Sequence, residues 1–182
     1  MKTINIYTDG ACSGNQSETN IGGWGALLEY GAHEKELWGG EINTTNNRME
    51  MKALIAALRA LKQEGLHLRI FSDSAYLMDC FRKKWYVNWQ KNNWKTSQKT
   101  DVENRELWEE LLQLLAAHKP EFYRVKGHVN LKSKVINKDA LYEKFVEWNG
   151  ESFQMEDFLH VTEMNNRADG LANRGIDELR AE

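Results

Sequence analysis

Apolar and polar residues alternate at the start of the chain, between Ile4 and Asp9. Ile4 and Ile6 face one side of this segment and their neighbours face the other, a period of two that is typical of a β-strand. The pattern ends at Asp9-Gly10, which is a turn signal. We therefore predict a strand over 4–9 with a carboxylate at its end. A buried carboxylate is costly unless something pairs with it.

Similar patterns predict four more strands, at residues 22–30, 33–43, 66–72 and 121–126. Gly31-Ala32 predicts a tight antiparallel connection between the first two of these. Helical spacing of apolar residues predicts helices over 48–62, 75–80, 101–117 and 140–148, a short one near 155–159, and a terminal one from Asn165. Gly65 is the expected C-cap of the first helix.

The order strand, helix, strand between Asp9 and Asp73 predicts a right-handed crossover with parallel strands. The ends of these strands would then lie side by side, with Glu50 in the first turns of the connecting helix. Each acid also has a local explanation: Asp9 as a turn former, Glu50 as a residue favoured near a helix N-terminus, and Asp73 as a helix cap. Asp169 is explained locally as a solvated helix residue, and its position is the weakest of the four.

Taken together, the four carboxylates indicate a site for hard divalent cations, which prefer oxygen ligands. Two such ions held close together activate water and stabilise the leaving oxygen of a phosphodiester. This chemistry is our interpretation of Asp9, Glu50, Asp73 and Asp169.

The composition is typical of one folded domain: 182 residues, of which 41% are hydrophobic and 28% charged. No apolar run is long enough to span a bilayer, and we expect no signal peptide. The only cysteines are Cys12 and Cys80, without the spacing of a zinc site. We therefore expect a cytoplasmic protein.

The net charge is −3, but the charge is unevenly distributed. Residues 82–99 contain no acidic residue and six basic ones, namely Arg82, Lys83, Lys84, Lys91, Lys95 and Lys99. Tryptophans are interleaved with them. This basic stripe indicates either a solvated helix face or a surface for a polyanion.

Five blocks of the sequence, in order, resemble type 1 ribonuclease H. They are Thr8-Asp9-Gly10-Ala11-Cys12-Ser13-Gly14-Asn15, Thr44-Thr45-Asn46-Asn47-Arg48-Met49-Glu50, Ser72-Asp73-Ser74, Val125-Lys126-Gly127-His128 and Asn166-Arg167-Ala168-Asp169. One block would be a weak signal, but five in register span nearly the whole chain.

The resemblance implies an α/β fold, with a central five-stranded mixed sheet of order 3-2-1-4-5 flanked by helices on both faces. It implies a sequence-independent endoribonuclease that hydrolyses the RNA strand of RNA–DNA hybrids and leaves 5′-phosphate and 3′-hydroxyl ends. Two Mg²⁺ ions per site are implied, with Mn²⁺ as an alternative, and no organic cofactor. The expected partner is an RNA–DNA hybrid and not a membrane, and we expect a monomer.

Carried over by motif, Asp9, Glu50, Asp73 and Asp169 are the metal ligands, and Asp9 is shared between the ions. His128 assists proton transfer or product release; its local explanation is a plain loop histidine. The resemblance places substrate contacts at Gly10, Cys12, Asn15, Thr45, Asn47, Lys83, Lys84, Trp85, Trp89 and Asn104. The segment of about 81–99 resembles the family's basic protrusion, which grips the DNA strand.

The chain departs from the family pattern at three places. Gln16-Ser17-Glu18-Thr19 stands where a proline is usual, and Ala75 replaces a polar amide side chain. The segment of about 129–164 is much longer than the loop that usually lies between His128 and the last acid. We interpret them as a structural insertion in a single domain over 1–182; a lid, added substrate contacts or a partner site are the alternatives.

Three other functions compete with the hybrid nuclease. They are a hybrid-binding module without catalysis, a related nuclease or integrase acting on DNA, and a small-molecule phosphohydrolase. Loss of one acid would favour the first, and none is lost. The Thr-Thr-Asn-Asn block and the basic tryptophan segment speak for a hybrid substrate, and a phosphohydrolase has no need of a basic stripe.

Overall fold

In the computed structural model, which describes residues 2–14 and 19–182, the strands form one mixed sheet of five. They are β1 (Thr3–Ser13), β2 (Ile21–Tyr30), β3 (His33–Ile42), β4 (His67–Ser72) and β5 (Lys119–Arg124). Their order is β3-β2-β1-β4-β5, as predicted. The β1–β2 and β2–β3 pairs are antiparallel, whereas β1–β4 and β4–β5 are parallel.

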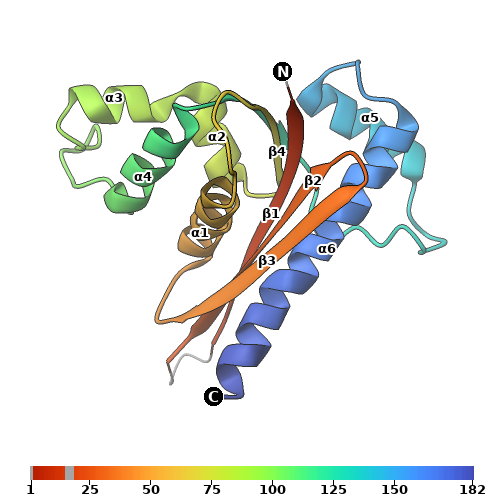
Figure 1. Ribbon diagram of the computed structural model, residues 1–182, viewed down its shortest axis with the longest axis horizontal. Helices are drawn as coiled ribbons and strands as arrows, with labels where there is room; N and C mark the ends of the chain where they lie inside the picture. The colour runs from red at the N-terminus through yellow and green to blue at the C-terminus, as the bar shows by residue number, and fades with distance from the viewer. Residues whose placement is uncertain (1, 15–18) are drawn as a thin grey trace.

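Helices cover both faces of the sheet, which also confirms the prediction (Figure 1). They are α1 (Asn46–Arg59), α2 (Ala75–Lys83), α3 (Trp85–Lys91), α4 (Arg105–Leu115), α5 (Lys138–Asn149) and α6 (Met155–Arg180). The first four lie on one side of the sheet, and α5 and α6 lie on the other. No helix among the described residues is both long and apolar enough to cross a membrane.

The alternation at the start of the chain divides the core into two clusters. Ile6 belongs to the cluster beneath α1, α2 and α4, whereas Tyr7 belongs to the cluster beneath α5 and α6. Both side chains are fully buried. The two faces of β1 are therefore both covered, as is usual when parallel strands are joined by helices.

The predicted end of β1 at Asp9-Gly10 is wrong. The strand continues to Ser13, because residues 10–13 pair in antiparallel register with residues 21–24 of β2. Strand pairing here overrides a local turn signal. As a result Asp9 lies within a strand, where it is paired with Gly25 of β2.

Three further boundaries differ from the predictions. Helix α1 ends at Arg59, and Gly65 lies in the loop before β4 with a φ of 71° instead of capping the helix. Helix α4 begins at Arg105 and not at residue 101. Strand β5 begins at Lys119 and includes Pro120, which an edge strand tolerates because one row of its backbone N–H groups has no partner strand.

The two helices predicted near 155–159 and from Asn165 are one continuous helix, α6. Gln154 and Asp157 form a capping box at its start. The buried side chains of Val161 and Met164 continue the apolar stripe across the predicted break. Helix α5 precedes it and packs through Phe145 against Phe158, so the segment after His128 folds onto this face of the sheet.

Helix α6 approaches β2 so closely that a side chain does not fit between them at Gly25. A Cβ atom there would lie 2.4 Å from the carbonyl oxygen of Ala168 and 2.6 Å from Cβ of Leu171. Glycine on the strand thus sets the distance between the sheet and the helix that carries Asp169.

We expect Gly25→Ala to lower the free energy of unfolding by roughly 1–3 kcal/mol, because backbone atoms of α6 must move. Gly170→Ala is the matched control, since nothing lies within 4 Å of its Cβ position. It should raise stability by about 0.5–1 kcal/mol through helix propensity. Urea denaturation of both variants measures these changes; equal effects would contradict the close-contact explanation.

Candidate functional site

Two of the acids lie side by side on neighbouring parallel strands, as predicted, although only Asp73 follows a strand end and Asp9 lies within β1. Thr8 of β1 is paired with Ser72, the last residue of β4, so the next residues along the two strands are Asp9 and Asp73. The Asp9 carboxylate accepts a hydrogen bond of 3.0 Å from the backbone N–H of Gly10. The strand register therefore brings the first pair of carboxylates together.

Glycine at position 10 brings the third acid to them. A Cβ atom on Gly10 would lie 2.5 Å from the backbone nitrogen of Glu50 and 2.7 Å from the carbonyl carbon of Met49. Helix α1 can therefore rest its backbone directly on β1. That contact places Glu50, in the second turn of the helix, beside Asp9.

Neutral residues cap the two helices at the site. The Thr45 hydroxyl accepts from the N–H of Arg48 at the start of α1, and the Ser74 hydroxyl accepts from the N–H of Leu77 at the start of α2. Asp73 is consequently not the cap of α2, and Asp9 is not a turn residue. The local explanations for these two acids are wrong.

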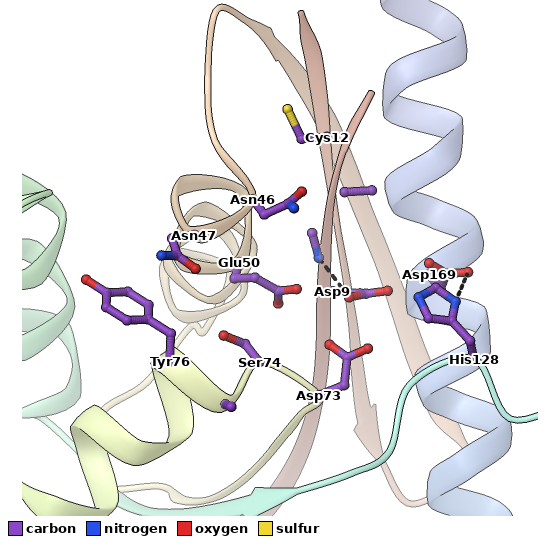
Figure 2. A pocket seen from close by; sticks show the side chains of 13 residues that line it. Asp9, Cys12, Asn46, Asn47, Glu50, Asp73, Ser74, Tyr76, His128 and Asp169 are labelled. Carbon is purple, nitrogen blue, oxygen red and sulfur yellow. Dashed lines mark hydrogen bonds and ion pairs between the residues drawn. The ribbon is translucent and has the colours of Figure 1, made fainter. Parts of the chain in front are cut away.

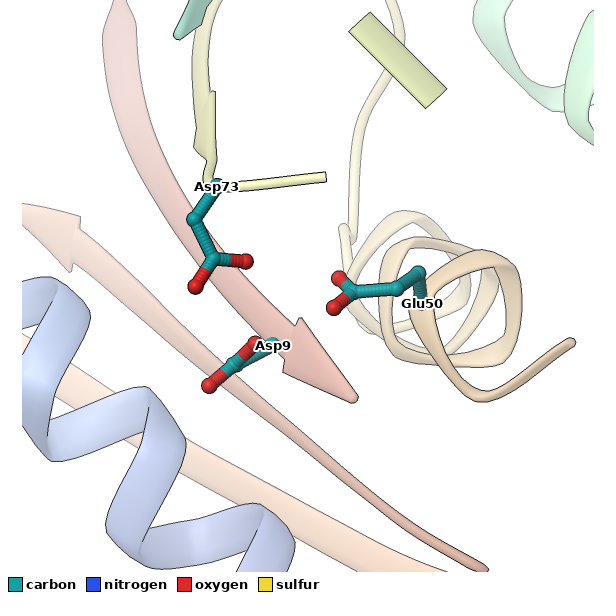
Figure 3. Close-up of side chains that lie close together, drawn as sticks. All are labelled: Asp9, Glu50 and Asp73. Carbon is teal, nitrogen blue, oxygen red and sulfur yellow. The ribbon is translucent and has the colours of Figure 1, made fainter. Parts of the chain in front are cut away.

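The three carboxylates converge on one point (Figure 3). One oxygen atom from each of Asp9, Glu50 and Asp73 lies within 4.8 Å of the others. Asp169 on α6 and His128 line the same pocket, which has a volume of about 440 Å³ (Figure 2). His128 Nδ1 lies 3.7 Å from Asp169 Oδ2. The structure thus brings together all five residues to which catalysis was assigned.

Burial makes this cluster electrostatically unfavourable as long as all its members are ionised. Asp9 is only 3% exposed and Glu50 6% exposed. Loss of hydration raises the pKa values of Asp9, Glu50 and Asp73, and for Asp9 and Glu50 the neighbouring carboxylates raise them further. The pKa of Glu50 rises to about 8.

A divalent cation fits this set of donors. Each of the three acids offers a carboxylate oxygen at the point of convergence, and hard cations take oxygen ligands. Glu50 Oε2 is buried without a hydrogen-bond partner among the described residues, so it is available as a ligand. Asp9, Glu50 and Asp73 could hold such an ion directly, and Asp169 lies beside Asp9 in the same pocket (Figure 2).

The pocket wall contains three of the predicted substrate residues, Gly10, Cys12 and Asn47. It also contains Asn46 and Tyr76, which the sequence reasoning did not assign to the site. Asn46 stands beside Asn47 in the same block, which was a usable signal, whereas nothing in the sequence pattern singles out Tyr76. Asn15 and the neighbouring residues 16–18 lie outside the described part of the chain.

Thr45 and Asn104, two of the predicted substrate contacts, both form hydrogen bonds with Arg48. The Arg48 backbone N–H donates to Thr45, and its guanidinium donates to Asn104 Oδ1 over 3.1 Å. The guanidinium also pairs with Glu106. The two predicted residues are therefore neighbours, although they are 59 positions apart in the sequence.

The predicted basic protrusion contains the end of α2 and all of α3. Trp85 is exposed, with Lys83 Nζ 5.7 Å from the centre of its ring, and Lys84 joins the two helices with a φ of 56°. Trp89 is different, because its ring packs against Trp108 in the core. Trp89 therefore helps to hold α3 in place and presents less surface than Trp85.

The model of the ribonuclease H family matches residues 1–146. Among curated proteins, ribonuclease H of Syntrophomonas wolfei is 52% identical over 128 residues, 70% of this chain and 86% of that protein. Ribonuclease H of Clostridium botulinum is 42% identical over 179 residues, 98% of this chain and 99% of that protein.

Two solved structures are also similar. LC9-RNase H1, described as a type 1 RNase H with the type 2 active-site motif, has a TM-score of 0.63 at 33% identity, over 70% of this chain and 64% of that one. LC11-RNase H1 in complex with an RNA/DNA hybrid has a TM-score of 0.53 at 20% identity, over 97% and 98% of the two chains. The second likeness concerns the fold alone.

We expect Asp9→Asn to stabilise the metal-free protein at pH 8 by roughly 1–3 kcal/mol and to have a smaller effect at pH 5. In the folded state the raised pKa values keep protons bound that the unfolded chain releases above about pH 4. Stability therefore falls as pH rises from about 4 towards 8 and above, and removing one charge relieves this loss.

Urea denaturation in the presence of a chelator, at both pH values, measures this effect. Asp177→Asn removes a charge from an exposed position near the end of α6 and is the control. Added Mg²⁺ should stabilise the native protein more than Asp9→Asn, because it binds the folded carboxylate cluster. A gain that is the same at pH 5 and pH 8 would contradict the repulsion argument.

Proposed function

The chain belongs to the ribonuclease H family, and from this premise we propose that it hydrolyses the RNA strand of RNA–DNA hybrids at the carboxylate pocket. The products are a 5′-phosphate and a 3′-hydroxyl. The observation that carries the proposal is the convergence of four acids and a histidine, drawn from five separate segments, on one open pocket. The family name alone would not say which residues act.

In this proposal Asp9, Glu50, Asp73 and Asp169 would hold divalent cations, with Mg²⁺ as the ion and two ions per site. Bound there, such ions activate water and stabilise negative charge on the phosphate. Asp9 is oriented for this role by the N–H of Gly10, and Glu50 by the contact of α1 with β1. Because these positions are fixed in the core, little reorganisation is needed when an ion binds.

His128 handles the proton that the reaction moves. The oxygen of water forms a bond to phosphorus and loses a proton, while the bond from phosphorus to O3′ breaks and O3′ gains one. An exposed imidazole beside Asp169 can carry a proton between these atoms and solvent. Its position at the mouth of the pocket suits product release as well.

The pocket also supplies groups that distinguish RNA from DNA. The 2′-hydroxyl both donates and accepts hydrogen bonds, and an asparagine amide can satisfy both. Asn46 and Asn47 line the pocket next to Glu50, and Gly10 and Cys12 of β1 line it as well. We assign these residues to the RNA strand, and Trp85 with Lys83 and Lys84 to the DNA strand.

A cleavage assay separates this function from its competitors. Labelled hybrid, duplex DNA and duplex RNA are each incubated with the protein in Mg²⁺ or in a chelator. Cutting of the RNA strand of the hybrid alone, in Mg²⁺ alone, supports the proposal. Binding without cutting would indicate a hybrid-binding module, and cutting of duplex DNA would indicate a DNA nuclease.

We expect Asp9→Asn to reduce the cleavage rate by more than about 100-fold, since even the outer partners of metal ligands are worth 10–100-fold. Hybrid binding should survive or tighten, because a negative charge is removed from the site. Single-turnover cleavage and fluorescence anisotropy measure the two quantities. Asp177→Asn, the same chemical change at an exposed position, should cleave at the native rate. Equal turnover by Asp9→Asn would refute the metal assignment.

We expect the combined change Lys83→Ala, Lys84→Asn and Trp85→Ala to weaken hybrid binding and flatten its salt dependence. Asparagine is chosen at position 84 because it tolerates the left-handed φ of 56° there. Each lost phosphate contact should reduce the log–log salt slope by about 0.7–0.9.

Anisotropy titrations at several KCl concentrations measure this slope. Lys35→Ala with Lys62→Ala is the control for net charge, because both lysines are exposed and lie away from the pocket. A slope that stays unchanged in the triple variant would rule out the assignment of the protrusion to the DNA strand.

A further inference from the structure

The segment that follows the catalytic histidine is basic over its whole exposed length. Between Val125 and Lys138 there are four lysines and no acidic residue; they are Lys126, Lys132, Lys134 and Lys138. All four are exposed. We call residues 126–138 the lysine loop. The loop begins at the Lys126-Gly127-His128 motif and ends at Lys138, the first residue of α5.

The lysine loop borders a second pocket that adjoins the first. This pocket has a volume of about 440 Å³, and its polar lining includes Lys126, Asn130, Ser133 and Asn137. His128 lines both pockets, so they meet at this side chain. A polymer that lies in the catalytic pocket can therefore continue into the second one without leaving the surface.

Hydrogen bonds fix the course of the lysine loop. Asn166 of α6 donates to the carbonyl oxygen of Val129 over 2.8 Å, and Val129 itself is buried. The Asn130 side chain accepts from the N–H of Lys132, and the Asn137 side chain caps α5. The backbone of the loop therefore has a defined course, with Lys126 in the wall of the second pocket.

The charges of the loop are free to act on a partner. Among the ion pairs formed by the described residues, none involves a lysine of this loop. In the protrusion, by contrast, Lys83 lies 4.0 Å from Asp79, and Lys95 pairs with Asp101. Exposed lysines without a carboxylate partner attract polyanions most effectively.

We propose that the lysine loop is a second binding surface for the sugar–phosphate backbone of the hybrid, on the side of the catalytic pocket opposite the protrusion. The inference rests on the proposed function. Figure 1 shows the two basic regions on opposite sides, with α3 at one side of the sheet and the loop, in teal, beyond α6. The hybrid would run from α3 across the carboxylates and past His128 to the loop.

Such a surface answers an electrostatic need of the site. Four carboxylates repel a polyanion, and the whole chain carries a net charge of −3. Basic groups on only one side of the catalytic pocket would bind the duplex at one end. The other end would then be free to move away from the carboxylates. Phosphate contacts on both sides fix its position over the pocket without reading its sequence.

The main test is the triple variant Lys126→Ala, Lys132→Ala and Lys134→Ala. In the cleavage assay we expect KM to rise by about ten-fold at 0.1 M salt, with kcat changed by less than about two-fold, because only binding is lost. In the Asp9→Asn background, which does not cut, the salt slope of hybrid binding should fall by about 0.7–0.9 for each phosphate contact removed.

The matched control is Lys35→Ala, Lys62→Ala and Lys119→Ala, which removes the same charge from exposed positions away from both pockets. Its KM and salt slope should stay at native values. Arginine at positions 126, 132 and 134 should restore binding, because it keeps the charge. If both triple alanine variants behave alike, net charge and not the loop is responsible, and the proposal is wrong.

Chemical acetylation locates the contact directly. With bound hybrid, Lys132 and Lys134 should be protected from the reagent, while Lys35 and Lys62 stay reactive. If polyglutamate but not the hybrid protects the loop, the surface takes an acidic protein and our proposal fails. Failure of the native chain to cut any hybrid would refute the proposed function instead; normal cutting with unchanged KM in the triple variant would refute only the role of the loop.

Discussion

The repulsion among buried carboxylates is the constraint on which the site depends. Oxygen atoms of Asp9, Glu50 and Asp73 within 4.8 Å of one another would separate if their backbones were free to move. They do not, because β1 and β4 are paired in the core and α1 rests on Gly10. The well-packed sheet therefore maintains a local arrangement that is unfavourable in itself, and the same unfavourable charge creates the affinity for a cation. The free energy of folding that the carboxylate cluster costs is recovered when a cation binds to it.

Each layer of the fold contributes to the cluster, and this explains why the topology matters. Two acids come from neighbouring parallel strands of the sheet, with Asp9 within β1 and Asp73 just after β4. Glu50 comes from the helix on one face, and Asp169 from the long helix on the other. A purely antiparallel sheet would point neighbouring strand ends in opposite directions. The crossover through α1 brings the C-terminal end of β4 beside Asp9 of β1, and α1 itself carries Glu50.

Much of this arrangement could be predicted from the sequence. Short-range periodicity predicted most of the helices and the meeting of Asp9 with Asp73, and the resemblance of the motifs implied the strand order, whereas α3 was not predicted. The errors have a common origin in long-range contacts. Strand β1 continues beyond the turn signal at Asp9-Gly10 because β2 pairs with it. Helix α6 continues through the predicted break because its apolar side chains pack against the sheet. Tyr76 reaches the pocket only through the placement of α2, which no local pattern encodes.

Helix α6 keeps His128 in position although a long segment follows it in the chain. His128 adopts a φ of 58°, a left-handed conformation that costs a non-glycine residue about 1–2 kcal/mol. A long flexible loop on one side would let this strain relax and the imidazole drift. Asn166 prevents this by holding the carbonyl group of Val129, the next residue. Asn166 lies one turn before Asp169 on the same helix. The histidine and its acidic neighbour are therefore positioned by one rigid element, so the chain beyond Val129 can be extended without loosening the catalytic pocket.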